Sequence, residues 1–180
     1  EGTKSIFWVR TDWLKKLNLP EPKTMDDILA ISEAFSKQDP DGNGKADTYG
    51  LATDGELSWL DGFFNSYHAY PRIWTNGPDG KLAYGSVQPE MKTVLGVLQK
   101  LYQDGQIDKE FVTKNYTQLY EPLGAGKYGL VYGPYYISIA PLQSIRTADS
   151  AADWKAFPII SADDKPALAQ HGIGVSGYWV

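Results

Sequence analysis

Cysteine is absent from the 180 residues of the chain. Its absence excludes disulfide bonds, thiol catalysis and zinc–thiolate sites, and it fits either the cytosol or a bacterial exterior. Basic residues form no stripe, and the net charge is −5, so we expect no nucleic-acid partner. No apolar run approaches the roughly 20 residues that a membrane-spanning helix needs, and no signal peptide or lipidation signal is present. The apolar ending at residues 178–180 leads us to expect that the natural chain continues.

Recognisable catalytic motifs are also missing. The two histidines, His68 and His171, are far apart, so no i,i+4 pair is available for a catalytic metal. A GxGxxG pattern at residues 124–129 precedes an expected strand, whereas a dinucleotide fingerprint follows a strand and opens a helix. Many carboxylates are present, but nothing marks two of them as a glycosidase acid–base pair. We therefore expect that the chain is not an enzyme.

Aromatic residues, in contrast, are abundant. Six Trp, twelve Tyr and six Phe make up 13% of the chain. Twelve tyrosines exceed what a core normally needs, because each buried Tyr hydroxyl requires a hydrogen-bond partner. An aromatic-rich binding surface would use these residues, and so would aromatic packing in a core with few Ile and Val. Both interpretations remain open on composition alone.

The hydrophobic pattern alternates between short strands and amphipathic helices. Thr24 with Asp27 is typical of a capped helix start, and Asp12 is the expected cap of the first helix. Strands are expected at residues 6–10, 72–75, 81–85, 127–132, 155–160 and 172–180. Helices are expected at residues 13–17, 24–39, 56–67, 88–103, 116–123 and 134–142. The mixture predicts an α/β fold, richer in helix than in strand, with residues 1–180 as a single domain.

The sharpest local motif is DPDGNGKAD at residues 39–47. Its oxygen donors recur in the order of an EF-hand calcium loop, in which Gly occupies position 6. Position 12 is Gly50, where an EF-hand supplies a bidentate Glu, and a solvated turn without metal is the alternative. No nearby base could activate water, so the expected role is structural. The predicted ligands at positions 1, 3, 5, 7 and 9 are Asp39, Asp41, Asn43, the carbonyl of Lys45, and Asp47.

Several motifs, in order along nearly the whole chain, resemble family 1 extracellular solute-binding proteins. They are WVRTDWLKKL at residues 8–17, PKTMDD at 22–27, DPDGNGKADTYG at 39–50, KLAYG at 81–85, LYQDGQID at 101–108 and GKYGL at 126–130. The likeness is closest to the large lipoprotein sugar receptors of Gram-positive bacteria. It implies a longer, two-lobed protein with a type II periplasmic-binding-protein-like fold, of which this helix-rich mixed chain is an internal fragment, mostly from one lobe.

The same resemblance implies a function. The full protein would be an extracellular, membrane-anchored lipoprotein that captures a sugar or oligosaccharide by lobe closure and delivers it to the membrane permease of an ABC transporter. In relatives with the calcium loop, an acidic ligand follows position 9. That residue is Thr48 here, so its hydroxyl or a water is expected to substitute. Because lobe surface that the missing segments would cover is left exposed, we expect that the fragment can self-associate.

The resemblance also points to sugar-binding side chains. Clefts of this family stack aromatic rings on sugar faces and bind hydroxyls with polar groups. The predicted substrate-binding residues follow strands or open helices, and they are Trp8, Arg10, Trp59, Tyr135 and Tyr136. Core packing would explain each of them equally well, and Arg10 could instead pair with Asp12. The alternatives to a transport receptor are a calcium-dependent carbohydrate-binding module and a fragment of a glycoside hydrolase.

Overall fold

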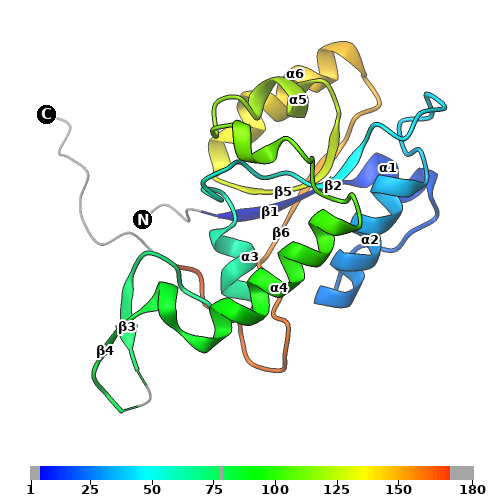
Figure 1. Cartoon of the computed structure of the whole chain (residues 1–180). Helices are drawn as coiled ribbons and strands as arrows, with labels where there is room; N and C mark the ends of the chain where they lie inside the picture. Colours follow the sequence, from blue (N-terminus) through cyan, green and yellow to red (C-terminus); the bar gives the residue numbers. More distant parts are fainter. Residues whose placement is uncertain (1–4, 78, 171–180) are drawn as a thin grey trace, which may run out of the picture.

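A four-stranded sheet lies at the centre of the chain, with strand order β2-β5-β1-β6 and helices on both faces (Figure 1). The structure is a computed structural model that describes residues 5–77 and 79–170, apart from the side chain of Ala148. The strands of the sheet are β1 (Ile6–Arg10), β2 (Tyr49–Leu51), β5 (Tyr128–Gly133) and β6 (Trp154–Phe157). This mixed α/β architecture confirms the fold class expected from the sequence.

Strand β5 is the centre of the sheet. It pairs antiparallel with β1 and parallel with β2, and β6 pairs antiparallel with the other edge of β1. All six residues of β5 are buried, as expected for a strand covered on both faces. The expected strands at residues 6–10 and 127–132 are therefore confirmed. The candidate sites lie beside the residues that directly precede and follow β5.

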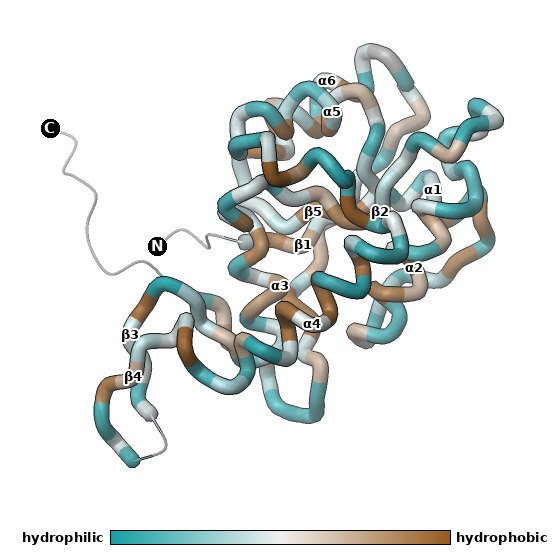
Figure 2. The backbone as a smooth tube through the Cα atoms, in the orientation of Figure 1, coloured by the Kyte–Doolittle hydropathy of each residue, from teal (hydrophilic) through white to brown (hydrophobic). Residues whose placement is uncertain are grey.

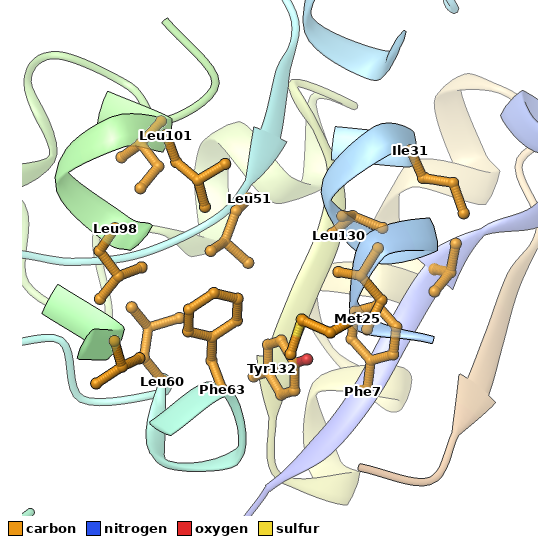
Figure 3. Packing of buried hydrophobic residues seen from close by; sticks show 14 of the residues in the cluster. Phe7, Met25, Ile31, Leu51, Leu60, Phe63, Leu98, Leu101, Leu130 and Tyr132 are labelled. Carbon is orange, nitrogen blue, oxygen red and sulfur yellow. The ribbon is translucent and has the colours of Figure 1, made fainter. Parts of the chain in front are cut away.

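Helices divide between the two faces of the sheet (Figure 1). One face packs against α2 (Met25–Lys37), α3 (Asp61–Ser66) and α4 (Pro89–Gln103), and the other packs against α5 (Tyr120–Gly124) and α6 (Pro141–Ala148). The short α1 (Thr11–Lys16) follows β1 directly. In the larger cluster (Figure 3), the ring of Phe7 stacks on Tyr132 at 4.7 Å, and Phe63 meets Tyr132 edge-on at 5.8 Å. Each fully buried aromatic side chain contributes about 1.5–3 kcal/mol.

The start of α2 shows how the local sequence sets a helix boundary. The N–H of Asp27 donates to Thr24 Oγ1 at 3.1 Å, and Asp27 Oδ2 accepts from the N–H of Thr24 at 2.9 Å, which confirms the expected capping box. The N–H groups of Lys23 and Thr24 lower the pKa of Asp27 below its usual range. The expected helix at residues 88–103 is likewise confirmed as α4, with Pro89 in its first turn.

Three expected helices differ from the structure. The helix expected at 56–67 is wrong in its first half, because Leu57 has a φ of 54° and α3 begins at Asp61. The helix expected at 134–142 is split into a 3-10 turn, η3 (Tyr135–Ile139), and α6, because a residue before proline such as Ala140 disfavours the helical region. Asp12 lies in the first turn of α1, and Arg10 is its N-cap residue.

A two-stranded hairpin projects from the body of the molecule (Figure 1). Its strands, β3 (Trp74–Asn76) and β4 (Leu82–Tyr84), confirm the two short strands expected at residues 72–75 and 81–85. Two further 3-10 turns are η1 (Gly85–Val87) and η2 (Phe111–Thr113). Across residues 5–77 and 79–170, no helix is long and apolar enough to span a bilayer. The strand expected at 172–180 and His171 fall outside the described residues.

Candidate functional site

Two candidate sites lie at the two ends of β5. Just before the strand, Lys127 Nζ donates to Asp47 Oδ2 in the loop that joins α2 to β2, at 2.5 Å. Just after the strand, Pro134 and Tyr136 line a pocket. We call the first site, residues 39–47, the acidic loop, and the second the aromatic pocket. The acidic loop is hydrophilic along most of its length and stands out from the sheet (Figure 2).

The aromatic pocket has a volume of about 510 Å³. It is formed by three parts of the chain: the turn before α3 with the first residue of that helix, a residue close to β3, and the turn after β5. Two of the predicted sugar-binding residues, Trp59 and Tyr136, meet here although they are far apart in sequence. The lining residues are Glu56, Ser58, Trp59, Asp61, Arg72, Pro134 and Tyr136.

The turn before α3 holds Trp59 in place. Asp54 is buried, and its Oδ1 accepts from the N–H of Ser58 at 2.7 Å. The left-handed conformation of Leu57 completes the turn. Trp59 is 7% exposed, and the centroid of its ring lies 5.8 Å from that of Tyr120. Trp59 therefore presents a small, fixed part of its surface to the pocket, while much of its ring belongs to the core between the sheet and α5.

Charged groups complete the pocket. The guanidinium of Arg72 is paired with the carboxylate of Asp61, and the N–H of Arg72 donates to Ser86 Oγ at 2.8 Å. Arg72 has a φ of 66°, a strained conformation of the kind that clusters at functional sites. Glu56 is exposed and forms no ion pair with any described residue. The pocket thus combines aromatic surface with both hydrogen-bond donors and acceptors.

The other predicted sugar-binding residues lie elsewhere. Trp8 lines a separate pocket of about 180 Å³ between β1, β6 and the segment of η3 and α6. The side chain of Arg10 is only 2% exposed, pairs with Asp12 at 2.5 Å and with Asp149 at 3.6 Å, and lies over the Trp13 ring. Tyr135 is exposed but does not line the aromatic pocket.

Sequence reasoning missed the three charged lining residues, Glu56, Asp61 and Arg72. They belong to no motif with a fixed spacing. Glu56 lies in a turn that was expected to be helical, Asp61 begins α3, and Arg72 lies in an expected strand. The positive φ of Arg72 has no sequence signal, because Arg is not a residue that favours the left-handed region. The aromatic residues of the pocket could therefore be predicted from the sequence, whereas its charged residues are identified only from the fold.

In the acidic loop, Asp39 organises the backbone. Its carboxylate accepts from the N–H groups of Gly42, Asn43 and Gly44, at 3.0, 3.1 and 2.9 Å. These bonds, that of Gly44 foremost, lower the pKa of Asp39 below its usual range. The positive φ of Gly44 allows the chain to turn at this point, as the motif predicted.

The remaining side chains of the loop converge on Asn43. Its Nδ2 lies 2.7 Å from Asp41 Oδ2 and 3.1 Å from Asp47 Oδ1. Burial, followed by the neighbouring Asp39 carboxylate, raises the pKa of Asp41, whereas Lys127 lowers that of Asp47. Crowded carboxylates favour the presence of a positive charge, and Lys127 supplies one.

The fit of this loop to calcium is partial. Carboxylate, amide and carbonyl oxygens are the ligands that calcium prefers. A side chain at position 12 has no space, because a Cβ on Gly50 would collide with the side chain and carbonyl of Ser32. The Thr48 hydroxyl donates instead to the carbonyl of Phe35 at 2.8 Å in the core, which leaves water as the expected substitute. As arranged, no group of three or more His, Cys, Asp or Glu side chains in the described ranges could hold a metal.

Comparisons with known proteins identify two relatives in Bacillus subtilis. No family model matches the chain. The chain is 36% identical over 128 residues to the polygalacturonan/rhamnogalacturonan-binding protein YtcQ of Bacillus subtilis, covering 69% of this chain and 25% of that protein. It is 35% identical over 134 residues to lipoprotein LipO of the same organism, covering 71% and 26%. The chain therefore spans about a quarter of the length of these relatives.

A solved structure supports the fold. The ABC-transporter substrate-binding protein FusA of S. pneumoniae, solved as an EF-hand mutant in complex with fructo-nystose, superposes with a TM-score of 0.72 and 23% identity. The match covers 96% of this chain and 35% of that one. At this identity the likeness establishes the fold, a part of a solute-binding protein. YtcQ and FusA are named as binding proteins rather than enzymes, in agreement with the expectation from sequence.

Proposed function

We propose, on the premise that the chain is a partial match to the family 1 extracellular solute-binding proteins of sugar ABC transporters, that it forms most of one lobe of such a receptor. Residues 1–180 would be a single unit within a longer extracellular protein, anchored as a lipoprotein like LipO. The protein would capture a sugar or oligosaccharide and deliver it to a membrane permease. Its function would be reversible binding without covalent chemistry.

The observation that carries this proposal is the composition of the aromatic pocket. Trp59 and Tyr136 offer ring surface beside the ion pair of Arg72 and Asp61. Sugars present apolar C–H faces that stack on aromatic rings, and hydroxyls that both donate and accept hydrogen bonds. A carboxylate such as Asp61 accepts from a hydroxyl, and a guanidinium such as Arg72 donates to one, and both are charge-assisted contacts.

We propose that binding needs closure of the second lobe over the pocket. One lobe supplies one wall, and closure of the second lobe would exclude water and strengthen each polar contact. Trp59 is held by the turn before α3 and by its packing near Tyr120. The backbone of Arg72 is fixed by its hydrogen bond to Ser86, so this wall is organised before the sugar arrives. A preorganised wall reduces the entropy lost on binding.

We further propose that the acidic loop binds a structural calcium ion through Asp39, Asp41, Asn43, the carbonyl of Lys45 and Asp47. The ion would supply positive charge among three carboxylates and would tie the end of α2 to the start of β2. The Asn43 amide nitrogen now lies between two carboxylates, and an amide turned over would present its oxygen instead. Water would complete the coordination.

The test of the main proposal compares two tyrosines of similar exposure in the full-length protein. Tyr136 is 39% exposed in the aromatic pocket, and Tyr102, on α4, is 37% exposed. Titration calorimetry with oligosaccharides should show that Tyr136→Ala weakens binding about tenfold or more, a loss typical of a stacked aromatic. Tyr102→Ala should bind as the wild type does. Equal effects of the two variants, absence of sugar binding, or release of reducing sugar would contradict the proposal.

A further inference from the structure

The aromatic pocket carries an excess of negative charge. Glu56, Asp61 and Arg72 are its charged lining residues. Arg72 is the cation among them, and its charge is already matched by the carboxylate of Asp61. Glu56 has no cationic partner in the described part of the chain, and its carboxylate is exposed at the pocket. The lining therefore has a net charge of one negative unit.

A buried carboxyl group, that of Asp54, holds the turn that carries Glu56 in place. Asp54 is 1% exposed and accepts a hydrogen bond from the N–H of Ser58, a lining residue. Its other oxygen, Oδ2, has no hydrogen-bond partner among residues 5–77 and 79–170, and no cation there pairs with it. Through its hydrogen bond to Ser58, the Asp54 side chain fixes the turn that carries Glu56 and Trp59.

From this charge distribution we infer that the aromatic pocket selects uncharged oligosaccharides and disfavours acidic ones such as oligogalacturonates. The inference rests on the proposed function and specifies its ligand class. An acidic sugar would bring its carboxylate against Glu56, or would have to displace the carboxylate of Asp61 from Arg72. Both routes place like charges together, which costs affinity. A neutral sugar can accept from Arg72 and donate to Asp61 and Glu56 without disturbing the ion pair.

The experiment measures affinity for two ligand classes with the full-length protein. Kestose, stachyose and maltotriose represent neutral oligosaccharides, and trigalacturonate represents the acidic class, each titrated by calorimetry at low salt. We expect the best neutral sugar to bind at least about tenfold more tightly than trigalacturonate, because like-charge juxtaposition opposes the latter. Glu56→Gln should reduce the ratio of the affinity for the best neutral sugar to the affinity for trigalacturonate several-fold. The matched control, Glu110→Gln, changes an exposed glutamate on the loop after α4 and should leave the ratio unchanged.

The outcomes separate the inference from the proposed function. If trigalacturonate binds as tightly as the neutral sugars, or if Glu56→Gln leaves the ratio unchanged, the charge argument is overturned while sugar binding stands. If none of the four sugars binds, the proposed function fails, and the inference fails with it. A ratio that narrows in high salt for the wild type, but little for Glu56→Gln, would support the inference, because salt screens repulsion between exposed charges.

Discussion

The two ends of β5 carry candidate sites of opposite character. At the start of the strand, the acidic loop gathers its groups from nine consecutive residues, and its carboxylates are occupied by its own N–H groups and by Lys127. At the other end, the aromatic pocket draws on three separate segments, and Glu56 remains unpaired among the described residues. The oxygens of the loop can all be named from the sequence. The pocket joins two residues named from the sequence, Trp59 and Tyr136, to charged residues that only the fold brings beside them.

This difference shows what each kind of site depends on. A loop site depends on local spacing, so its oxygens can be named from the sequence, but its occupancy depends on an ion. A pocket between elements depends on tertiary packing, so the residues that line it come together only when the sheet and helices are in place. β5 joins the two, because Lys127 contacts the loop and Pro134 with Tyr136 line the pocket.

Truncation of Trp59 should have the largest effect. Trp59→Ala should cost about 3–5 kcal/mol of unfolding free energy, because it leaves a cavity where a mostly buried ring packs near Tyr120. Tyr136→Ala should change stability by less than about 0.5 kcal/mol, since its ring is partly exposed. Urea denaturation measures both. Similar losses in the two variants would show that the pocket is not divided into a core part and a ligand-facing part.

The packing of β2 against α2 gives the next largest effect. Gly50→Ala should cost about 3 kcal/mol or more, because a Cβ would collide with the backbone of Ser32. The matched control is Gly96→Ala in α4, where a Cβ meets open space, and it should be neutral or stabilising by up to about 1 kcal/mol. Chemical denaturation in chelator measures both. A harmless Gly50→Ala would remove the steric reason for the missing twelfth ligand.

Calcium bound at the acidic loop should raise the unfolding free energy by less than Trp59→Ala or Gly50→Ala lowers it. At 100 times its dissociation constant, a ligand adds about 2.7 kcal/mol, which raises Tm by about 5–10 °C for a domain of this size. Thermal melts in millimolar calcium and in excess chelator would measure the shift. Asp41→Asn should weaken the response, and magnesium should not reproduce it. An unchanged Tm, with no metal in the purified protein, would mean that the loop is an ordinary turn.

The pH dependence of the calcium-free protein should show the smallest effect. The folded-state pKa values of Asp39 and Asp47 are lowered by the Gly44 N–H and by Lys127, respectively. Their stabilising contribution is therefore present above the unfolded pKa of about 4 and is lost as pH falls through the folded values. Urea titrations from pH 7 to pH 3 should show this loss. Lys127→Met should reduce the part due to Asp47, and an identical acid profile would contradict that pairing.

Features that depend on residues close together in the sequence could be predicted, and features that depend on tertiary contacts could not. The capping box of Thr24 and Asp27 and the extent of α4 depend on neighbours within a few residues, and both were predicted correctly. The turn at Leu57 was missed because its conformation depends on the buried Asp54 carboxylate. Arg10 was expected at the ligand, but its contact with Asp149, which β6 and α6 bring near, was not foreseeable.

Hydrogen–deuterium exchange of the full-length protein tests the central claim most directly, because it reports on both ends of β5 in one experiment. Addition of an oligosaccharide should slow exchange in the segments 54–61 and 134–136, which contain six of the seven residues that line the aromatic pocket. It should leave exchange at residues 39–47 unchanged. Addition of calcium alone should protect residues 39–47. Sugar-dependent protection that avoids the pocket residues would contradict the assignment of the aromatic pocket as the sugar site.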